Sequence, residues 1–164
     1  MIIGTVVGGE QTAQQLQAMI PALRKGLEQG IARACLRVLT RSKEKLTGEV
    51  LQVRSGRLRR SINMRMEGTG GDQVSGTVGT NVLYAAIHEF GGTIPGHPLE
   101  AVNAKALRFM PKGASDFIFR RRVQIPDIRM PERSFLRSAL REMLPGIRQD
   151  VGASLHTSLD EVRR

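Results

Sequence analysis

The chain has 164 residues, of which 40% are hydrophobic and 24% are charged, a balance that permits a packed core and excludes wholesale disorder. Its single cysteine excludes an internal disulfide framework and a cysteine-rich zinc site. The formal net charge of +10 points to a polyanion or an acidic protein surface as a partner, and composition alone does not choose between them.

The first residues, Met1–Gly9, form an apolar segment. This segment lacks a basic leader and is too short for a secretory signal, and no apolar run in the chain approaches the roughly 18 residues of a membrane span. We therefore expect a protein made in the cytoplasm, without a membrane partner. Its first residues are expected to form a strand or a tail that is ordered against a neighbour.

The longest helical pattern runs from Gln11 to about Leu46, with an end predicted at Thr47–Gly48. Apolar residues recur at three- and four-residue intervals and share one face: Leu23, Leu27, Ile31, Ala34, Val38 and Leu39. Pro21 suits the first turn of a helix, so we expect a short helix over residues 12–20 that meets the longer one at an angle. The opposite face is rich in arginine and lysine, which is typical of a solvated face; a binding face is the alternative.

A first β-hairpin is predicted after this helix. Ser55–Gly56 indicates a turn, and Arg57–Ile62 indicates one short helical turn. Two short segments, Asn63–Glu67 and Gln73–Val78, then flank the glycine-rich stretch Gly68–Asp72. The glycines lack the Gly-Lys-Ser/Thr ending of a phosphate loop and no clear helix follows them, so we interpret them as a turn.

A short helix over Val82–Phe90, capped by Asn81 and ended by Gly91–Gly92, is expected to lead into an irregular insert that contains Pro95, Gly96, His97 and Pro98. A second pair of strands is predicted at residues 106–110 and 117–125. The run Arg120, Arg121, Arg122 falls inside the latter, where strand alternation cannot bury all three side chains. We therefore expect one face of that strand to meet water or an acidic partner.

The last helix is predicted to begin at Pro131. Its apolar stripe has four-residue spacings with one of three: Leu136, Leu140, Leu144, Ile147, Val151, Leu155 and Leu159. Pro145–Gly146 is expected to kink or split it, since proline lacks a backbone donor and crowds the preceding turn. Leu155 and Leu159 are candidate interface residues, and their stripe packs either on the first helix or on another subunit.

These elements together predict an α+β fold, with a small antiparallel sheet packed by a long N-terminal helix and a kinked C-terminal helix. We expect a single domain over residues 1–164. The N-terminal segment 1–10 and the C-terminal helical arm 145–164 are expected to extend for contacts with other subunits.

Catalytic chemistry finds little support. His88–Glu89 begins like a zinc-protease pattern, but position 92 is glycine, so the second ligand is missing. Cys35 lies in mid-helix, a poor place for an exposed thiolate. We expect no catalytic, cofactor-binding or metal site and no enzyme activity. Binding of nucleic acid through phosphate contacts is supported by charge, although few aromatic residues are available for base stacking.

Three motifs in succession resemble a known family: Ser55–Ile62 (SGRLRRSI), Val78–Gly92 (VGTNVLYAAIHEFGG) and Met130–Leu140 (MPERSFLRSAL). Together they are similar to tail-completion and neck proteins of tailed bacteriophages, the virion morphogenesis or minor tail proteins that include the Mu protein G type. The resemblance spans roughly residues 55–144. Ser134 stands where the family commonly has a second proline, a departure that we expect to loosen the start of the last helix.

The motif residues have structural interpretations. Gly56 permits the turn before Arg57 and Leu58, while Gly91 lets the chain reverse after the motif segment that contains His88 and Glu89. Tyr84, Ile87 and Phe90, at three-residue spacing, are expected to anchor the short helix in the core. Pro131 and Phe135 are expected to start and pin the last helix.

The resemblance implies a structural virion protein without turnover, which joins tail to head as a homo-oligomeric ring at the neck. Its implied partners are other neck and tail proteins, with DNA nearby in the channel but no sequence-specific binding and no cofactor. Arg120, Arg121 and Arg122 are the candidate interface to acidic residues of an adjacent ring. The alternative function is that of a basic nucleic-acid-binding accessory protein, which rests on charge alone.

Overall fold

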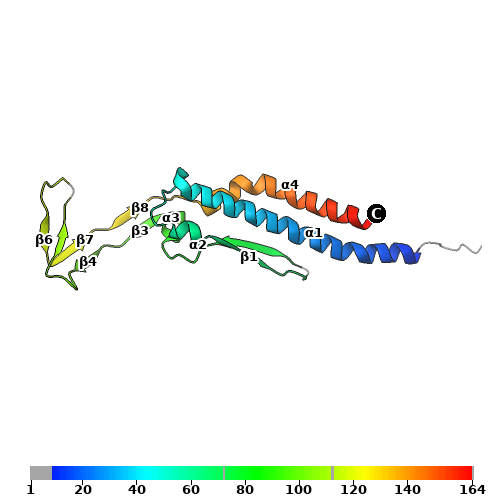
Figure 1. Cartoon of the computed structure of the whole chain (residues 1–164), viewed down its shortest axis with the longest axis horizontal. Coiled ribbons are helices and arrows are strands. Elements are labelled where there is room, and N and C mark those ends of the chain that lie inside the picture. Colours follow the sequence, from blue (N-terminus) through cyan, green and yellow to red (C-terminus); the bar gives the residue numbers. More distant parts are fainter. Residues whose placement is uncertain (1–8, 72, 112, 164) are drawn as a thin grey trace, which may run out of the picture. The chain divides into compact units, whose positions relative to one another are not determined.

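The computed structural model describes residues 9–71, 73–111 and 113–163, so most of the apolar N-terminal segment lies outside the described residues. The chain divides into two compact units. The first comprises the residues up to Ala85 together with those from Ser134 onward, and the second comprises Ala86–Arg133. The predicted α+β class is confirmed, because two long helices occur with short antiparallel strands (Figure 1). The single domain stays a prediction.

Helix α1 (Gly9–Glu44) runs without interruption through Pro21, so the predicted angle between two helices is wrong. The φ that proline fixes is itself helical, and the loss of one backbone donor did not divide a 36-residue helix. A π-helical turn, η1 (Lys45–Glu49), follows and closes the helix. Gly48 lies there with φ of 111°, which confirms the predicted end at Thr47–Gly48.

Helix α4 (Leu136–Arg163) begins five residues after Pro131, so the predicted start is wrong. Ser134 fixes the start instead, since its Oγ accepts a hydrogen bond from the backbone N–H of Ser138 at 3.2 Å. Ser134 thus stabilises the helix start that the sequence comparison expected it to loosen. The helix continues through Pro145 without a split.

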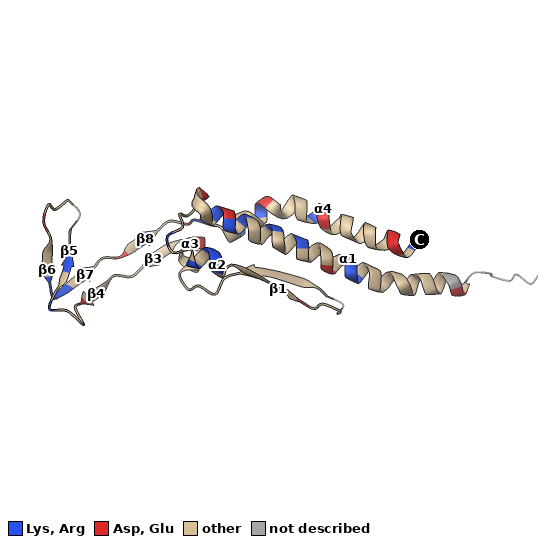
Figure 2. Ribbon diagram, viewed as in Figure 1, with Lys and Arg blue, Asp and Glu red and all other residues tan. Residues whose placement is uncertain are grey.

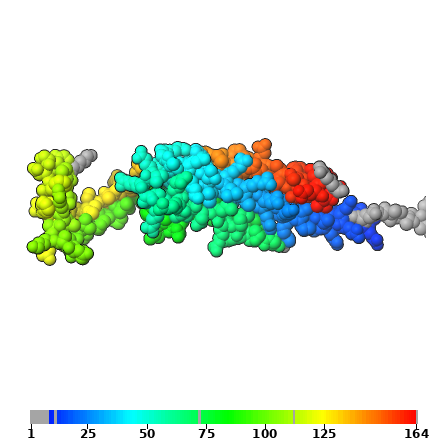
Figure 3. Space-filling model, in the orientation of Figure 1, coloured from blue at the N-terminus to red at the C-terminus, as the bar shows by residue number. Residues whose placement is uncertain are grey.

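Helices α1 and α4 lie side by side in antiparallel directions (Figures 1 and 3). Two buried glycines of α1 allow a close approach. A Cβ atom on Gly26 would lie 2.7 Å from Ser158 Oγ and 2.9 Å from the backbone oxygen of Ser154, and one on Gly30 would lie 3.0 Å from Val151 Cα. The buried hydroxyl groups of Ser154 and Ser158 fit this narrow interface, where larger side chains would separate the helices.

Helix α2 (Arg57–Ser61) and the hairpin of β1 (Asn63–Glu67) and β2 (Ser75–Gly79) complete the first unit. The predicted hairpin is confirmed, with its second strand beginning two residues later and ending one residue later than expected. Arg24 and Glu28 of α1 hold the hairpin turn, through Arg24 Nη1 to the oxygen of Gly70 at 3.1 Å and Gly70 N to Glu28 Oε1 at 2.7 Å.

The core of this unit combines segments that are distant in sequence. Its buried members are Leu46, Ile62, Ala85 and Phe135. They come from the turn after α1, the residue after α2, the start of α3 (Ala85–Phe90) and the segment before α4. Packing of these side chains therefore fixes one end of the helix pair, where α1 ends and α4 begins, against the hairpin.

The second unit is an antiparallel ribbon that the sequence predicted only in part. Strand β3 (Gly92–Ile94) pairs with β8 (Ile128–Met130), and β4 (His97–Glu100) pairs with β7 (Arg122–Ile125). The hairpin of β5 (Leu107–Phe109) and β6 (Ile118–Arg120) stands at the far end of the ribbon (Figure 1).

Two expectations for this unit are wrong. The insert after α3 is not irregular, because its residues supply β3 and β4. The strand predicted over residues 117–125 is two strands with different partners, divided at Arg121. In the described residues, the predicted single sheet is four separate two-stranded sheets.

None of the helices in the described part of the chain has both the length and the hydropathy needed to cross a membrane.

Candidate assembly surfaces

The first motif builds the entry to the hairpin. Gly56 precedes α2 with φ of 70°, a left-handed conformation that favours glycine, as predicted. Leu58 packs against the core cluster, while Arg57 is exposed. The Ser61 hydroxyl lies 2.6 Å from that of Thr80, which ties α2 to the segment after β2. This motif is therefore a structural joint between α2 and the hairpin.

The second motif differs from the prediction. Tyr84 and Phe90 are 42% and 61% exposed, so neither is the core anchor that their spacing suggested. The buried side of α3 instead carries Ala85 and Glu89, which are one turn apart and 5% and 4% exposed. The backbone oxygen of His88, a half-buried residue, accepts a hydrogen bond from Arg133 N at 2.8 Å.

Glycine is required after α3, as predicted. Gly91 has φ of 69°, and a Cβ atom there would lie 2.8 Å from the backbone nitrogen of Glu132. The chain reverses at this point and enters β3. In the third motif Phe135 is fully buried, which confirms that it pins the start of α4, whereas Pro131 is an exposed residue between β8 and that helix.

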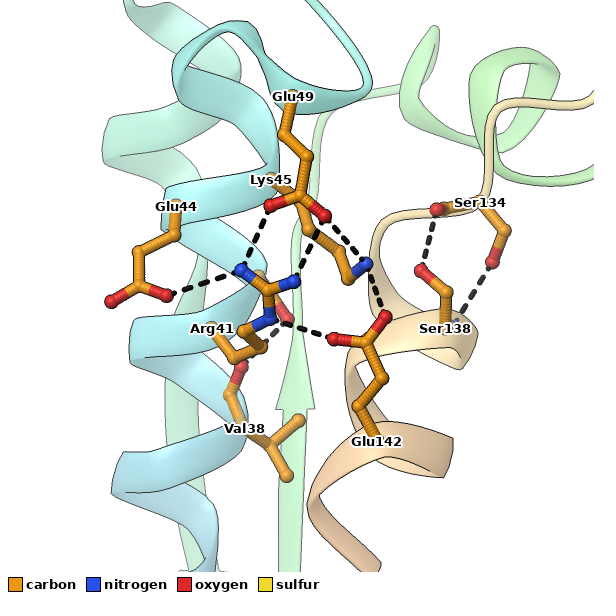
Figure 4. A network of polar contacts seen from close by, with 9 residues as sticks. Val38, Arg41, Glu44, Lys45, Glu49, Ser134, Ser138 and Glu142 are labelled. Atoms are coloured by element: carbon orange, nitrogen blue, oxygen red, sulfur yellow. Dashed lines mark hydrogen bonds and ion pairs between the residues drawn. The ribbon is translucent and has the colours of Figure 1, made fainter.

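A charged cluster joins the end of α1 to α4 (Figure 4). Lys45 is 4% exposed, and its Nζ lies 2.6 Å from Glu142 Oε1 and 3.2 Å from Glu49 Oε1. Arg41 contributes Nε at 2.7 Å from Glu142 Oε2 and two contacts of 2.8 Å to Glu49. Two cations thus bridge two carboxylates, and Lys45, the buried member of this cluster, pairs with both carboxylates.

The pKa values in this cluster shift in the directions that the ion pairs require. Hydrogen bonds from Lys45 and then Arg41 lower the pKa of Glu142, and those from Arg41 and then Lys45 lower the pKa of Glu49. Burial acts to lower the pKa of Lys45, but hydrogen bonds to Glu142 and Glu49 outweigh it, so the pKa is raised. All four groups are held in their charged forms, which suits a structural cluster and not a proton-transfer site.

An apolar groove of about 420 Å³ opens between α1, β2 and α4 in the first unit. Its lining is aliphatic apart from a glycine, a cysteine and an arginine: Ile31, Ala34, Cys35, Val38, Gly76, Val78, Leu136, Arg137, Leu140, Ile147 and Val151. Cys35 is 6% exposed, and burial raises the pKa of its thiol. The thiol is therefore protonated at neutral pH, and Cys35 packs here as a small apolar group.

The predicted arginine run lies at a strand junction. Arg120 ends β6, Arg121 lies between the strands, and Arg122 begins β7, and all three are exposed. Arg122 Nε lies 3.3 Å from Glu100 Oε1, an exposed pair that contributes little to stability. Among the described residues, the side chains of Arg120 and Arg121 have no ion-pair partner. Figure 2 shows basic residues on β5 and at the junction of β6 and β7.

Large apolar side chains accompany these arginines. Phe117, Ile118 and Phe119 are 47%, 38% and 64% exposed, and the guanidinium of Arg108 lies 3.8 Å from the centre of the Phe117 ring. Apolar residues beside arginine are typical of protein interfaces. The sequence prediction had named the arginines but not the phenylalanines. In the described residues, β5 and β6 pair only with each other, so no further strand covers these side chains.

The C-terminal part of α4 packs on α1 through Ser154 and Ser158. Leu155 and Leu159, each next to one of these serines, are half-buried. Of the two alternatives left open for this stripe, packing on the first helix is observed. A contact of Leu155 and Leu159 with another subunit stays a prediction.

In the described residues, no group of three or more His, Cys, Asp or Glu side chains is arranged to hold a metal ion. The sequence matches the phage virion morphogenesis family over residues 12–159, most of the chain. The chain belongs to this family. Membership of the phage virion morphogenesis family implies a role in assembling a phage particle. The resemblance of the three motifs to virion morphogenesis proteins is thereby confirmed. Neither a curated protein nor a solved structure matches the chain.

Proposed function

We propose that this phage virion morphogenesis protein acts at the head–tail junction, as a tail-completion or neck protein that assembles into a ring and catalyses no reaction. The observation that carries the proposal is the ribbon of residues 86–133, whose far end exposes arginines and phenylalanines together. A two-stranded ribbon has no core of its own in which to bury these side chains. They are suited to burial against another virion protein.

Arg120 and Arg121 define the chemistry of that partner. Their side chains face solvent beside Phe119, and arginine next to aromatic residues is the composition of energetic centres in protein interfaces. We assign them to an acidic surface on an adjacent ring of the neck or tail. A DNA channel is the less suitable partner, because a basic lumen that binds phosphates would resist the passage of DNA during ejection.

The test uses phage particles that lack this gene, supplied with the triple variant Arg120→Glu, Arg121→Glu, Arg122→Glu. Electron microscopy is expected to show full heads beside detached, otherwise normal tails, as it would for the phage without the gene. The matched control carries the same charge reversal at exposed positions of the two long helices, as Lys25→Glu, Arg33→Glu and Arg148→Glu, and is expected to restore joined particles. Joined, infectious particles from the first variant would refute the assigned role of the arginines.

A nucleic-acid-binding accessory function is the second candidate. The exposure of Phe117 and Phe119 next to Arg108 favours it, because aromatic rings beside arginines can stack on bases. The chain has one Tyr and no Trp, so copurifying nucleic acid would dominate the ultraviolet absorbance of the purified protein. The assembly proposal expects a protein-like spectrum and no salt-dependent binding to single-stranded DNA at physiological ionic strength. Tight binding with a steep salt dependence would favour the second candidate.

A further inference from the structure

The groove of α1, β2 and α4 is open and lined by aliphatic side chains, among them Leu140, which is 48% exposed. A groove of about 420 Å³ with this lining resembles the apolar pockets in which proteins hold hydrophobic partners. None of the described residues that line it belongs to the ribbon of the second unit. The arginine interface proposed above therefore leaves this surface unused.

One wall of the groove is a strand with an open edge. Gly76 and Val78 of β2 line the groove, whereas no residue of β1 does. Strand β2 pairs with β1 on one side only, and in the described residues no other strand lies beside it. Its second edge therefore offers backbone N–H and C=O groups to an added strand.

The chain itself contains a segment of matching chemistry. Ile2–Val7 has no charged residue, and alternate positions Ile3, Thr5 and Val7 are all β-branched. Such a sequence favours an extended strand, in which the side chains of Ile3, Thr5 and Val7 lie on one uncharged face. Among the described residues of the groove lining, Arg137 alone is charged. An uncharged segment that enters the groove brings no unpaired charge of its own.

The reach of this segment determines which copy of the groove it can fill. Helix α1 begins at Gly9, and the nearest groove residue on that helix is Ile31. Those 22 residues of helix span about 33 Å at 1.5 Å per residue. The seven residues from Ile2 to Gly9 span at most about 25 Å when fully extended. The segment is therefore too short to return to the groove of its own chain, and the occupant must come from a second copy.

We propose that Ile2–Val7 of one copy lies in the groove of the next copy as an added strand along β2. This inference rests on the homo-oligomeric assembly of the proposed function and names the contact between neighbouring subunits. Such head-to-tail exchange closes a ring when the rotation between subunits is right.

The sole native cysteine, Cys35, lies in the groove and provides the test. In the full-length variant Thr5→Cys, the introduced thiol lies on the same strand face as Ile3 and Val7. Mild oxidation is expected to form a disulfide between this thiol and Cys35 of another copy, seen as dimers and larger species on a non-reducing gel. Peptide mass spectrometry identifies the paired positions. The variant Ala13→Cys, whose new thiol lies on an exposed turn of α1 outside the groove, is expected to give no link to Cys35.

Two further variants test the groove itself. Adding Leu140→Glu to Thr5→Cys is expected to reduce the link at least tenfold, because a carboxylate would enter the apolar lining. Adding Leu144→Glu is the matched control, since Leu144 is also exposed on α4 but does not line the groove, and the link should persist. Circular dichroism checks that both remain folded.

Several outcomes would overturn the exchange. One is a disulfide within a single chain, which would migrate on the gel as a shifted monomer. The others are a disulfide that Leu140→Glu does not reduce, and no disulfide to Cys35 at millimolar concentration of the chain. Because the measurement uses the purified chain, it is independent of the particle experiment. If the arginine variant fails to join heads to tails and the cysteine variant forms no disulfide with Cys35, the proposed neck function stands. Only the strand exchange is then refuted.

Discussion

The close approach of α1 and α4 predicts opposite effects for the same substitution at two glycines. Replacing glycine by alanine inside a helix stabilises by about 0.5–1 kcal/mol when space is available. Gly152 of α4 has no atom within 4 Å of a would-be Cβ, so Gly152→Ala should increase the free energy of unfolding by that amount. At Gly26 the Cβ would lie 2.9 Å from a backbone oxygen of α4, which cannot rotate away.

Gly26→Ala must therefore move the two helices apart or distort α1. Overpacking of this kind costs about 1–3 kcal/mol, which exceeds the gain in helix propensity. We expect a net loss of about 1 kcal/mol, so that the two alanine variants differ by about 2 kcal/mol. Urea unfolding followed by the helical circular dichroism signal measures both values. Equal stabilisation by Gly26→Ala and Gly152→Ala would refute the close helix contact.

The remaining predictions concern the core, the charged cluster and the turn after α3. Phe135→Ala should lower the free energy of unfolding by about 3–5 kcal/mol, because the ring is fully buried, whereas Phe119→Ala, at a 64% exposed position, should change it little. Glu142 has a lowered pKa, so its stabilising contribution is present above the ordinary glutamate pKa of 4.5 and is lost as the pH falls through the lowered value. Glu142→Gln should thus flatten the acid side of a plot of melting temperature against pH. Gly91→Ala should destabilise the second unit, since it combines a left-handed φ with a backbone contact of 2.8 Å, and proteolysis within residues 92–130 should quicken.

Each of these has a contradicting result. Equal effects of the two phenylalanine substitutions would mean that Phe135 is not at the centre of the core. If the melting temperature of Glu142→Gln fell at acidic pH as steeply as that of the unaltered protein, the ion pairs of Glu142 with Lys45 and Arg41 would not contribute to stability. Normal resistance to protease in Gly91→Ala would mean that the chain reversal does not need glycine.

Most local elements could be predicted from sequence because their causes are local. The apolar periodicity of α1 and α4, the glycine at position 48 and the turn at Gly56 each depend on a few neighbouring residues. The errors arose where distant residues decide. Whether Arg121 continues or divides a strand depends on β7 pairing with β4, whose residues are more than twenty positions away. Likewise, Tyr84 and Phe90 share a spacing that suggests anchoring, but packing of Ala85 with Phe135 determines which side of α3 is buried.

The sequence by itself determined the α+β class, the two long helices, the first hairpin and, through three ordered motifs, the virion morphogenesis family. These follow from periodicity, turn residues and short motifs, all of which are properties of adjacent positions. Only the tertiary structure decided that Gly26 and Gly30 bring α4 close to α1, that Lys45 is buried between Glu142 and Glu49, and that an open strand edge borders an apolar groove. Each of these brings together residues more than ninety positions apart or depends on which strands lack a neighbour, and no local pattern encodes either property.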